Sequence, residues 1–277
     1  MISVAILTMN EEADLPACLE SISWCDDVHV IDSGSTDATV SIAQAAGARV
    51  HFNRFDSFGK QRNWALANCP FRYEWILFLD ADECSTPEFQ RALSAAVATV
   101  PETTAGFYLC WKMILDGKWL KRCDSFRKWQ FRLLRLGRAN FADFGHGQKE
   151  FNVAGEIEYI REPYLHFAFS KGWSRWIDRH NRYSDLEAAE RLGTQISWRQ
   201  ICSAHGSIRN KALKPLVSKL PGWPFAAFCI RYFLKFGFLE GRPGFIYCVN
   251  MAYYEFLIQI KMKDLRRGKR AQRIGFE

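Results

Sequence analysis

The stretch LFLDADE, residues 77–83, decides the fold, because an apolar run ends there on clustered acids. Its first three residues favour a buried strand, whereas Asp80, Asp82 and Glu83 need water, a cation or hydrogen bonds. Desolvating two carboxylates at a strand end is costly unless a cation such as Mg²⁺ or Mn²⁺ offsets their charge. The alternative is a solvated turn that caps the next helix.

Strands and helices alternate around this stretch. Short apolar runs predict buried strands over residues 2–8, 27–32, 48–52 and 74–79. Apolar residues at helical spacing predict helices over residues 12–23, 36–46 and 59–68. Asn10 suits an N-cap for the first helix, and Gly47 suits the end of the second. This alternation predicts an α/β fold, with a mostly parallel sheet covered by helices on both faces.

Polar residues follow three of these strands, at residues 8–11, 32–37 and 80–83. Because ligands bind beyond the carboxyl ends of parallel strands, we expect a ligand site at this edge of the sheet. After residue 100 the pattern changes to strands over 105–113 and 129–136. Helices are then predicted over residues 171–192, 196–213, 224–238 and 244–267.

The composition argues against several classes of protein. The candidate spans 223–239 and 244–260 are broken by charges, so neither offers the roughly 18 uninterrupted apolar residues of a membrane helix. The nine cysteines form no C-x-x-C pair, which favours free thiols in a reducing cytoplasm and disfavours a zinc site. The opening MISVAILTMNEE lacks the basic start of a signal peptide. The basic C-terminal run has no interleaved aromatic platform, so nucleic acid is a poor partner.

Four motifs, TMNEE, VIDSGSTDAT, GKQRNWAL and LFLDADE, occur in this order along the chain. Together they resemble a family 2 glycosyltransferase of the GT-A fold over about residues 1–170. The later pieces RLLRLGRANF, LHFAFS, RHNRYSDLEA and GFLEGRPGF resemble bacterial lipopolysaccharide core and exopolysaccharide glucosyltransferases of the WaaE/KdtX type. The resemblance implies a Rossmann-like, nucleotide-sugar-binding catalytic domain over residues 1–170. It implies a helical acceptor- or membrane-associating region over residues 171–277.

The resemblance also assigns site residues. The nucleotide-sugar donor would be held by Thr8, Asn10, Glu11, Asp32, Ser33, Arg62 and Asp80. A divalent cation, Mg²⁺ or Mn²⁺, would be held by Asp80, Asp82 and His166, with Asp80 nearer the ribose. Other interpretations stay open: Asp32 and Asp37 could cap the 36–46 helix, Arg62 could form a surface ion pair, and His166 could be a core residue.

An inverting sugar transfer needs a carboxylate that takes the proton from the acceptor hydroxyl. Relatives often carry a His-Glu pair a few residues after a Phe, but in ANFADFGHGQKEF a glycine follows His146. Glu150 is therefore the first choice for the base and Asp143 the second. His146 would orient either one or contact the donor phosphates.

The predicted function is metal-dependent transfer of a hexose, from UDP-glucose, onto a lipid-linked bacterial glycan. An apolar helical face and a basic C-terminus suggest peripheral attachment to the cytoplasmic face of the inner membrane. The face consists of Phe225, Phe228, Cys229, Tyr232, Phe233 and Phe236. The alternative is that these helices only pack on the main domain. Two other classes stay open, a haloacid-dehalogenase-like phosphatase that uses the D-x-D and a non-catalytic membrane-surface protein.

Overall fold

The computed structural model describes residues 1–144, 147–193 and 216–274, and the chain divides into two compact units. The N-terminal unit comprises Met1–Lys121 and Phe126–Lys171. The C-terminal unit comprises Arg122–Ser125 and Gly172–Glu277. The short piece Arg122–Ser125 therefore belongs to the second unit, although it lies far from the rest of that unit in sequence.

A central sheet of seven strands forms the middle of the N-terminal unit, counted over the described residues. Its spatial order is β12 (Glu156–Tyr159), β6 (Thr104–Leu109), β9 (Gln130–Arg135), β4 (Trp75–Asp80), β1 (Ile2–Thr8), β2 (Val28–Asp32) and β3 (Arg49–Phe52). All neighbours pair in parallel except β9, which runs antiparallel to both β4 and β6. The predicted α/β class with a mostly parallel sheet is confirmed.

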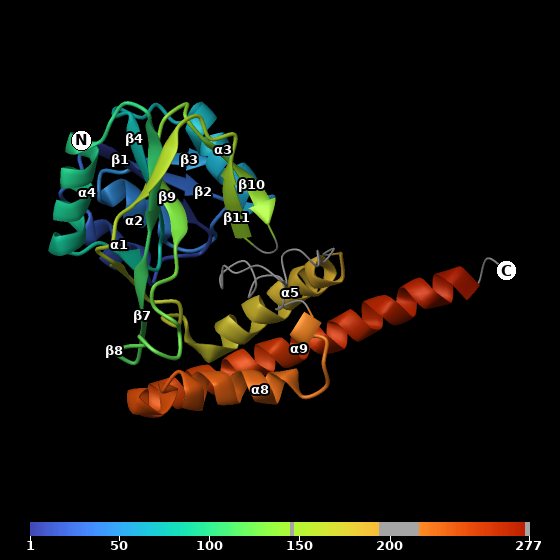
Figure 1. The fold of residues 1–277 in the computed structure, drawn as a ribbon. Helices are drawn as coiled ribbons and strands as arrows, with labels where there is room; N and C mark the ends of the chain where they lie inside the picture. Colours follow the sequence, from blue (N-terminus) through green and yellow to red (C-terminus); the bar gives the residue numbers. More distant parts are fainter. Residues whose placement is uncertain (145–146, 194–215, 275–277) are drawn as a thin grey trace. The chain divides into compact units, whose positions relative to one another are not determined.

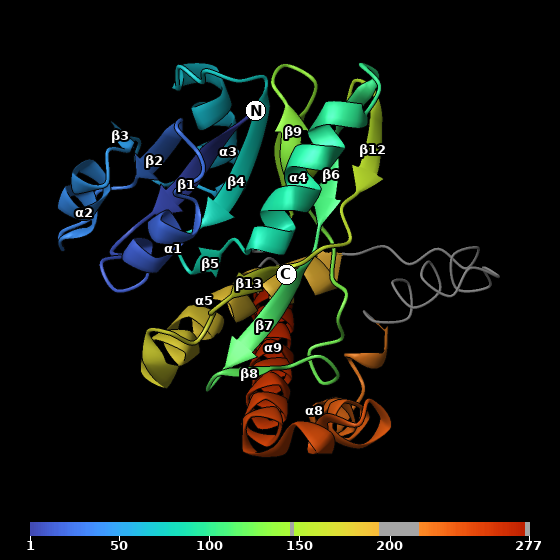
Figure 2. The same ribbon diagram turned by 90° about the vertical axis from the view of Figure 1, so that its left-hand side faces the viewer.

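Helices cover both faces of this sheet (Figure 1). One face carries α1 (Leu15–Ser21), α2 (Thr39–Ala45) and α4 (Pro87–Thr99), and Figure 2 looks onto this face. The core on this side includes Leu77, Leu79, Phe89 and Leu93. The other face carries α3 (Phe58–Asn68) and the hairpin of β10 (Asn140–Phe144) with β11 (Gly147–Phe151). Ile76, Phe78 and Phe141 lie in the core on that side. Successive side chains of a strand alternate between faces, so Asp80 belongs to the α3 face together with Phe78.

A smaller sheet consists of β5 (Glu83–Cys84), β13 (Tyr164–His166), β7 (Trp111–Leu115) and β8 (Lys118–Trp119). The single strand predicted over residues 105–113 is wrong, because the chain passes from β6 in the large sheet to β7 in the small one. The pairing of β13 with β5 sets His166 opposite Glu83. This backbone pairing brings a residue from late in the unit next to the acidic end of β4.

The prediction that Asn10 caps the first helix is wrong. Asn10 has a left-handed backbone (φ 57°), and the helix starts at Leu15. The Asn10 side chain instead accepts a hydrogen bond from the Thr36 amide at 2.8 Å. The predicted end of the second helix is closer, since Gly47 follows α2 with φ 78°. At the start of α4, the Thr86 side chain accepts a hydrogen bond from the Phe89 amide at 3.2 Å.

The C-terminal unit is helical over its described residues. It contains α5 (Gly172–Gly193), α8 (Trp223–Cys229), a π-helical turn (Ile230–Leu234), a 3₁₀ turn (Gly237–Glu240) and α9 (Gly241–Ile274). The predicted helix over 224–238 is therefore broken into three pieces, with Phe236 in a left-handed conformation between two of them. The helix predicted over 196–213 lies outside the described residues. No helix in the described ranges is both long and apolar enough to cross a membrane.

The motif GFLEGRPGF shapes the C-terminal unit rather than a catalytic site. The Glu240 carboxylate, 4% exposed, accepts hydrogen bonds from the backbone amides of Arg122 at 2.6 Å and Cys123 at 3.1 Å. A Cβ on Gly237 would lie 2.7 Å from the Arg231 carbonyl oxygen, and one on Gly244 would lie 2.5 Å from the Gly237 carbonyl oxygen. These glycines are needed because backbone segments approach each other closely.

Candidate functional site

The polar residues that follow β1, β2 and β4 meet at one edge of the central sheet. Thr8 pairs with Asp32 in the register of β1 and β2, and Leu7 pairs with Asp80 in the register of β1 and β4. The edge is the carboxyl end of these parallel strands, where α/β sheets bind ligands. The structure thus brings together the strand ends that the sequence singled out.

Asp32 organises the turn that follows β2. Its carboxylate accepts hydrogen bonds from the Thr8 hydroxyl at 3.0 Å and from the amides of Gly34 and Ser35, both at 2.8 Å. The residue is only 3% exposed. Asp32 therefore caps a turn and not the helix after it. The helix start is held by Asp37, which accepts from the Thr39 amide at 3.0 Å.

The loop after β1 carries a carboxylate in an unusual environment. Burial raises the pKa of Glu11 to about 7, although the nearby Lys171 ammonium opposes this shift. Lys171 forms an ion pair with Glu11 and donates a hydrogen bond to the Asn10 carbonyl oxygen at 3.0 Å. Ser33 lies at the same edge, where its hydroxyl accepts from the Gln61 side chain at 3.2 Å.

Two buried arginines hold Asp80. Arg132 binds the carboxylate with both terminal nitrogens, at 3.0 Å to Oδ1 and 2.6 Å to Oδ2. Arg62 donates to Oδ1 at 3.0 Å. Burial alone would raise the pKa of Asp80, but the two guanidinium groups hold this pKa well below its usual range. The Asp80 side chain stays 32% exposed and ionised at the carboxyl end of β4.

Arg62 is the most deeply placed cation of the site. It is 1% exposed, so the interpretation as a surface ion pair is wrong. Its guanidinium lies 5.6–5.9 Å from the ring centroids of Phe58, Phe78 and Phe141. Burial, with the nearby Arg132, lowers the pKa of Arg62 to about 10. Its Nε and Nη1 are buried and have no hydrogen-bond partner among the described residues. Buried donors without partners are costly, so this guanidinium is suited to an anionic ligand.

Glu83 supports the positions of Asp80 and Arg132. Its carboxylate accepts from the Asp80 amide at 2.8 Å, from Arg132 at 3.0 Å and from the Tyr164 hydroxyl at 3.2 Å. Burial raises the pKa of Glu83, which is 1% exposed. The third acid of LFLDADE is therefore a support for Asp80 and Arg132.

Asp82 and His166 form a second pair of side chains at the end of β4. The His166 Nε2 lies 3.5 Å from the Asp82 Oδ2, with the two side chains 20% and 15% exposed. Burial would lower the pKa of His166, but the Asp82 carboxylate outweighs it and raises this pKa. Two donor atoms at this spacing fit a single divalent cation that lies about 2.0–2.2 Å from each. By contrast, both oxygens of Asp80 already bind arginine.

The two candidate bases have different surroundings. Asp143 caps α3, because its carboxylate accepts from the Gly59 amide at 3.0 Å and the Ser57 hydroxyl at 2.7 Å. Glu150 lies opposite Phe141 in the hairpin and forms a hydrogen bond with Tyr108. Directly opposed residues of an antiparallel pair share a face, so Glu150 points to the same side as the Phe141 ring that contacts Arg62. His146 lies outside the described residues.

Sequence reasoning missed Arg132 and Lys171. Arg132 stands inside the apolar strand WQFRLLRL, and a single charge there is a signal, because a buried arginine needs a carboxylate partner. Lys171 follows β13 and gives no comparable signal. Its partner Glu11 is distant in sequence, so only the folded chain pairs them.

A further cluster of potential metal ligands lies at the other edge of the sheet, around the start of β2. Within the described residues, His29, His51 and Cys69 have ligand atoms within 4.8 Å of one another. His29 lies 3.2 Å from Asp27 through Nε2 and 2.9 Å from the His51 ring through Nδ1. Arg49 binds the same Asp27 at 3.0 Å. Hydrogen bonds account for both nitrogens of His29, and the nearby guanidinium disfavours a cation.

Comparison with known proteins shows the family to which the chain belongs. A sequence model of the family "Glycosyl transferase family 2" matches residues 3–148, more than half of the chain. An uncharacterized glycosyltransferase of Rickettsia felis is 26% identical over 279 residues, which cover 95% of this chain and 89% of that protein. The lipopolysaccharide core biosynthesis glycosyltransferase LpsC of Rhizobium meliloti is 26% identical over 268 residues, which cover 94% of this chain and 91% of that protein.

Among solved structures, the mannosyltransferase PcManGT of Pyrobaculum calidifontis has a similar fold. Its complex with GDP-Man and Mn²⁺ matches with a TM-score of 0.51 and 16% identity, covering 94% of this chain and 86% of that chain. The likeness supports the GT-A fold that the four motifs predicted.

Proposed function

Because this chain belongs to glycosyl transferase family 2 and is a glycosyltransferase, we propose that it transfers a hexose from a UDP-sugar with inversion and with a divalent cation. The observation that carries the proposal is the cluster at the end of β4. Arg62 offers buried, unpartnered donors to an anion there, and Asp82 and His166 offer a cation two ligand atoms 3.5 Å apart. A donor diphosphate and its cation need these two kinds of group side by side.

Each donor-site residue has a part in the proposal. Thr8, Asn10, Glu11, Asp32 and Ser33 form the nucleoside pocket, with Asp32 fixing the turn that presents Ser33. Arg62 binds the diphosphate. Asp80 keeps its ion pairs with arginine and faces the ribose hydroxyls. Asp82 and His166 hold Mg²⁺ or Mn²⁺, which would neutralise charge on the departing diphosphate.

The transfer is a single displacement. The acceptor hydroxyl oxygen bonds to the anomeric carbon, while the bond from that carbon to the diphosphate oxygen breaks. The acceptor proton goes to Glu150, the carboxylate that we propose as the general base. Asp143 is the less suited alternative, because both of its oxygens are engaged in capping α3.

A nucleoside diphosphate release assay tests the proposal. The purified chain is incubated with UDP-glucose, UDP-galactose or GDP-mannose, with Mn²⁺, Mg²⁺ or EDTA. We expect release with a UDP-sugar, with UDP-glucose the favoured donor, and loss of release both in EDTA and in Asp82→Ala. The matched control is Asp26→Ala, an exposed acid just before β2 that pairs with Arg72 at the opposite edge of the sheet. If release in EDTA and release by Asp82→Ala both equalled release by the wild type with Mn²⁺, a metal-dependent transfer would be contradicted.

The glycosyltransferase assignment leaves no place for the phosphatase and non-catalytic alternatives. For the acceptor we propose a lipid-linked bacterial glycan, as in lipopolysaccharide core assembly. The resemblance to the core glycosyltransferases and the relative LpsC support this. Residues 1–170 would act as the catalytic domain, and residues 171–277 would attach peripherally to the cytoplasmic face of the inner membrane.

Exposed apolar side chains in the C-terminal unit support membrane attachment. Phe225 and Leu234 are each 72% exposed, and Phe233 and Phe236 are 54% and 55% exposed. Large exposed patches of this kind mark interaction surfaces. We expect sedimentation with anionic phospholipid vesicles, reduced in Phe225→Ser/Leu234→Ser. Leu186→Ser, which removes a 52%-exposed side chain of α5, is the control. Equal sedimentation of all three proteins would contradict attachment through this surface.

A further inference from the structure

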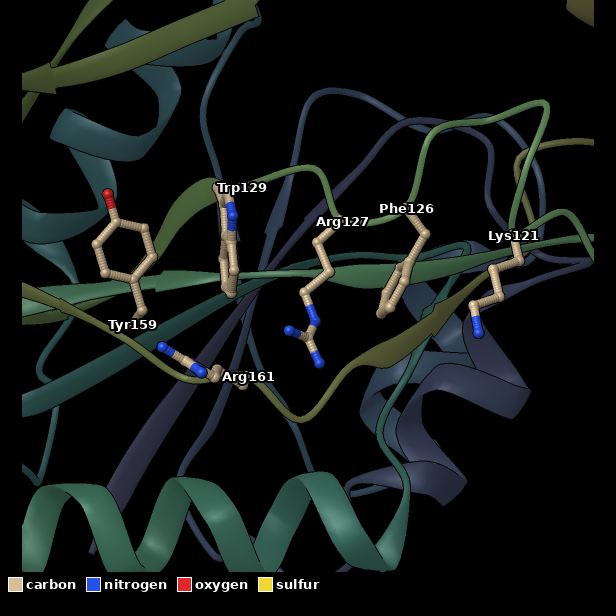
Figure 3. A pocket seen from close by; sticks show the side chains of 6 residues that line it. All are labelled: Lys121, Phe126, Arg127, Trp129, Tyr159 and Arg161. Atoms are coloured by element: carbon tan, nitrogen blue, oxygen red, sulfur yellow. The ribbon is translucent and has the colours of Figure 1, made fainter. Parts of the chain in front are cut away.

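A cavity of about 830 Å³ lies in the N-terminal unit, outside the cluster around Asp80. It is lined by Lys121, Phe126, Arg127, Trp129, Tyr159 and Arg161 (Figure 3). Three of these side chains are aromatic and three are cationic, and no lining residue is acidic. In Figure 3, Arg127 lies between Trp129 and Phe126, while Tyr159 and Arg161 come from the segment around the end of β12. Trp129 is 37% exposed and Tyr159 is 55% exposed, so flat ring surfaces are available in the cavity.

The strand register sets this cavity at the same edge of the sheet as the donor site. Gln130, the first residue of β9, pairs with Leu109 at the end of β6. Leu133 of β9 pairs with Leu77 of β4, and β9 runs antiparallel to β4. The start of β9, where Trp129 stands, therefore lies at the carboxyl end of β4, the end that carries Asp80.

A chain of contacts links the cavity to the proposed base. Tyr159 stacks on Tyr108, with ring centroids 5.1 Å apart and an interplanar angle of 27°. Trp129 meets Tyr159 edge-on at 4.9 Å. Tyr108 in turn forms a hydrogen bond with Glu150. A ligand on the Tyr159 ring would therefore be linked to the Glu150 carboxylate by one ring contact, Tyr159 to Tyr108, and one hydrogen bond.

We propose that this cavity binds the acceptor, and that the acceptor carries an anionic sugar, with a phosphate or a carboxylate, next to the hydroxyl that is glycosylated. That the ligand is the acceptor rests on the proposed function, whereas the expected anionic sugar rests on the residues that line the cavity. Aromatic rings offer apolar faces that pack against the C–H face of a pyranose. Guanidinium groups bind phosphate and carboxylate oxygens in a bidentate way. Arg127 and Arg161 would hold the anion, and Trp129 and Tyr159 the sugar ring.

Binding is measured by calorimetry in EDTA, without donor, so that the result does not depend on transfer. The probes are glucose 6-phosphate, glucuronate, glucose, inorganic phosphate and UMP. We expect glucose 6-phosphate or glucuronate to bind at least about tenfold tighter than glucose, because charge-assisted hydrogen bonds from the guanidinium groups add to the contacts with the sugar ring. Whether phosphate or carboxylate binds better identifies the anion of the acceptor. Inorganic phosphate that binds as tightly as glucose 6-phosphate, or UMP that binds more tightly and depends on Arg127 and Arg161, would overturn a saccharide site.

Variants locate the binding. Arg127→Ala and Arg161→Ala should each weaken the anionic sugar about tenfold or more, and Trp129→Ala should weaken it while inorganic phosphate binding changes less. The control Arg91→Ala removes an exposed arginine of α4 that pairs with Glu88. Equal affinity in wild type and in Arg127→Ala/Arg161→Ala would overturn the proposal. The protein could bind the anionic sugar through these residues and yet release no nucleoside diphosphate. That result would contradict the proposed function but not the binding site.

Discussion

Arg132 holds Asp80 by two parallel hydrogen bonds, from Nη1 to Oδ1 at 3.0 Å and from Nη2 to Oδ2 at 2.6 Å. The same Nη2 also reaches Glu83 at 3.0 Å. One buried guanidinium therefore fixes the direction of the partly exposed Asp80 carboxylate and pairs with the buried Glu83 carboxylate behind it. The orientation of the D-x-D is set by a residue of the neighbouring strand β9.

Arg132→Ala should destabilise the fold strongly, because it leaves Asp80 and the buried Glu83 without their shared partner. Removing one member of a buried ion pair costs about 3–5 kcal/mol. Urea unfolding monitored by fluorescence measures this loss. Arg91→Ala, which breaks an exposed pair, should cost no more than about 1 kcal/mol. A loss in Arg132→Ala as small as that of the control would contradict the role given to Arg132.

The sequence predicts most of the sheet because each of these strands has a local signal in its own residues. An apolar run followed by polar residues is enough to place the end of β4 and the residues Thr8, Asp32 and Asp80 at one edge. Arg132 was missed because its partner belongs to another strand. Asn10 was wrongly made a helix cap, because its left-handed backbone is fixed by hydrogen bonds to the loop after β2.

The helical region was predicted less well for a similar reason. Glu255 interrupts the apolar run 244–260, and the sequence shows only that this run does not span a membrane. In the structure Glu255 is 3% exposed and pairs with Arg191 of α5. The predicted helix 224–238 is broken where Phe236 adopts a left-handed backbone, and a Cβ on the following Gly237 would lie 2.7 Å from the Arg231 carbonyl oxygen.

His166→Ala should weaken the cation site. If His166 and Asp82 share a divalent cation, the Mn²⁺ concentration for half-maximal nucleoside diphosphate release should rise at least about tenfold. Saturating Mn²⁺ should restore much of the activity, which a folding defect would not permit. A Mn²⁺ dependence equal to that of wild type would mean that His166 is only a core residue beside Asp82.

Glu150→Gln and Asp143→Asn separate the two candidate bases. Loss of a general base typically lowers the rate about 10²–10⁴-fold, so Glu150→Gln should lower kcat by this range at unchanged stability. Asp143→Asn should instead weaken the cap of α3 and destabilise the fold by about 1 kcal/mol. Steady-state kinetics and urea unfolding of both variants give the answer. A larger kcat loss in Asp143→Asn than in Glu150→Gln would reverse the assignment.

The contribution of His29 and His51 to the stability of the protein should fall as the pH drops below about 6.5, the ordinary pKa of histidine. Burial lowers the pKa of both His29 and His51, with Asp27 opposing the shift at His29 and Arg49 adding to it at both. The unfolded chain then binds protons that the folded chain cannot accept, so acid favours unfolding. His166, Glu11 and Glu83 have raised pKa values and act in the opposite direction, so the test must isolate the histidine contribution.

His51→Gln tests this sign, because His51 is half-buried and faces the His29 ring, with Cys69 as the third side chain of the cluster. The free energy of unfolding of wild type, measured in urea between pH 5 and 7.5, should decline more steeply on acidification than that of His51→Gln. Asp27 titrates below this window, since its pKa is lowered. A steeper decline in the variant would show that the two histidines are charged in the folded protein.

The pair of Arg191 and Glu255 should be a main stabilising contact of the C-terminal unit. Arg191 donates to both Glu255 oxygens, at 2.6 and 3.2 Å, and the Trp223 indole donates to one of them at 2.9 Å. Glu255→Ala leaves a buried guanidinium without this partner and should cost about 3–5 kcal/mol in urea unfolding. Arg191→Met/Glu255→Met removes both charges at similar volume and should cost less than Glu255→Ala, because no unpaired charge stays buried. Asp185→Ala, which breaks the more exposed pair with Lys261, should cost no more than about 1 kcal/mol. If Glu255→Ala lowered the free energy of unfolding no more than Asp185→Ala, the contact between α5 and α9 would be held by apolar side chains alone.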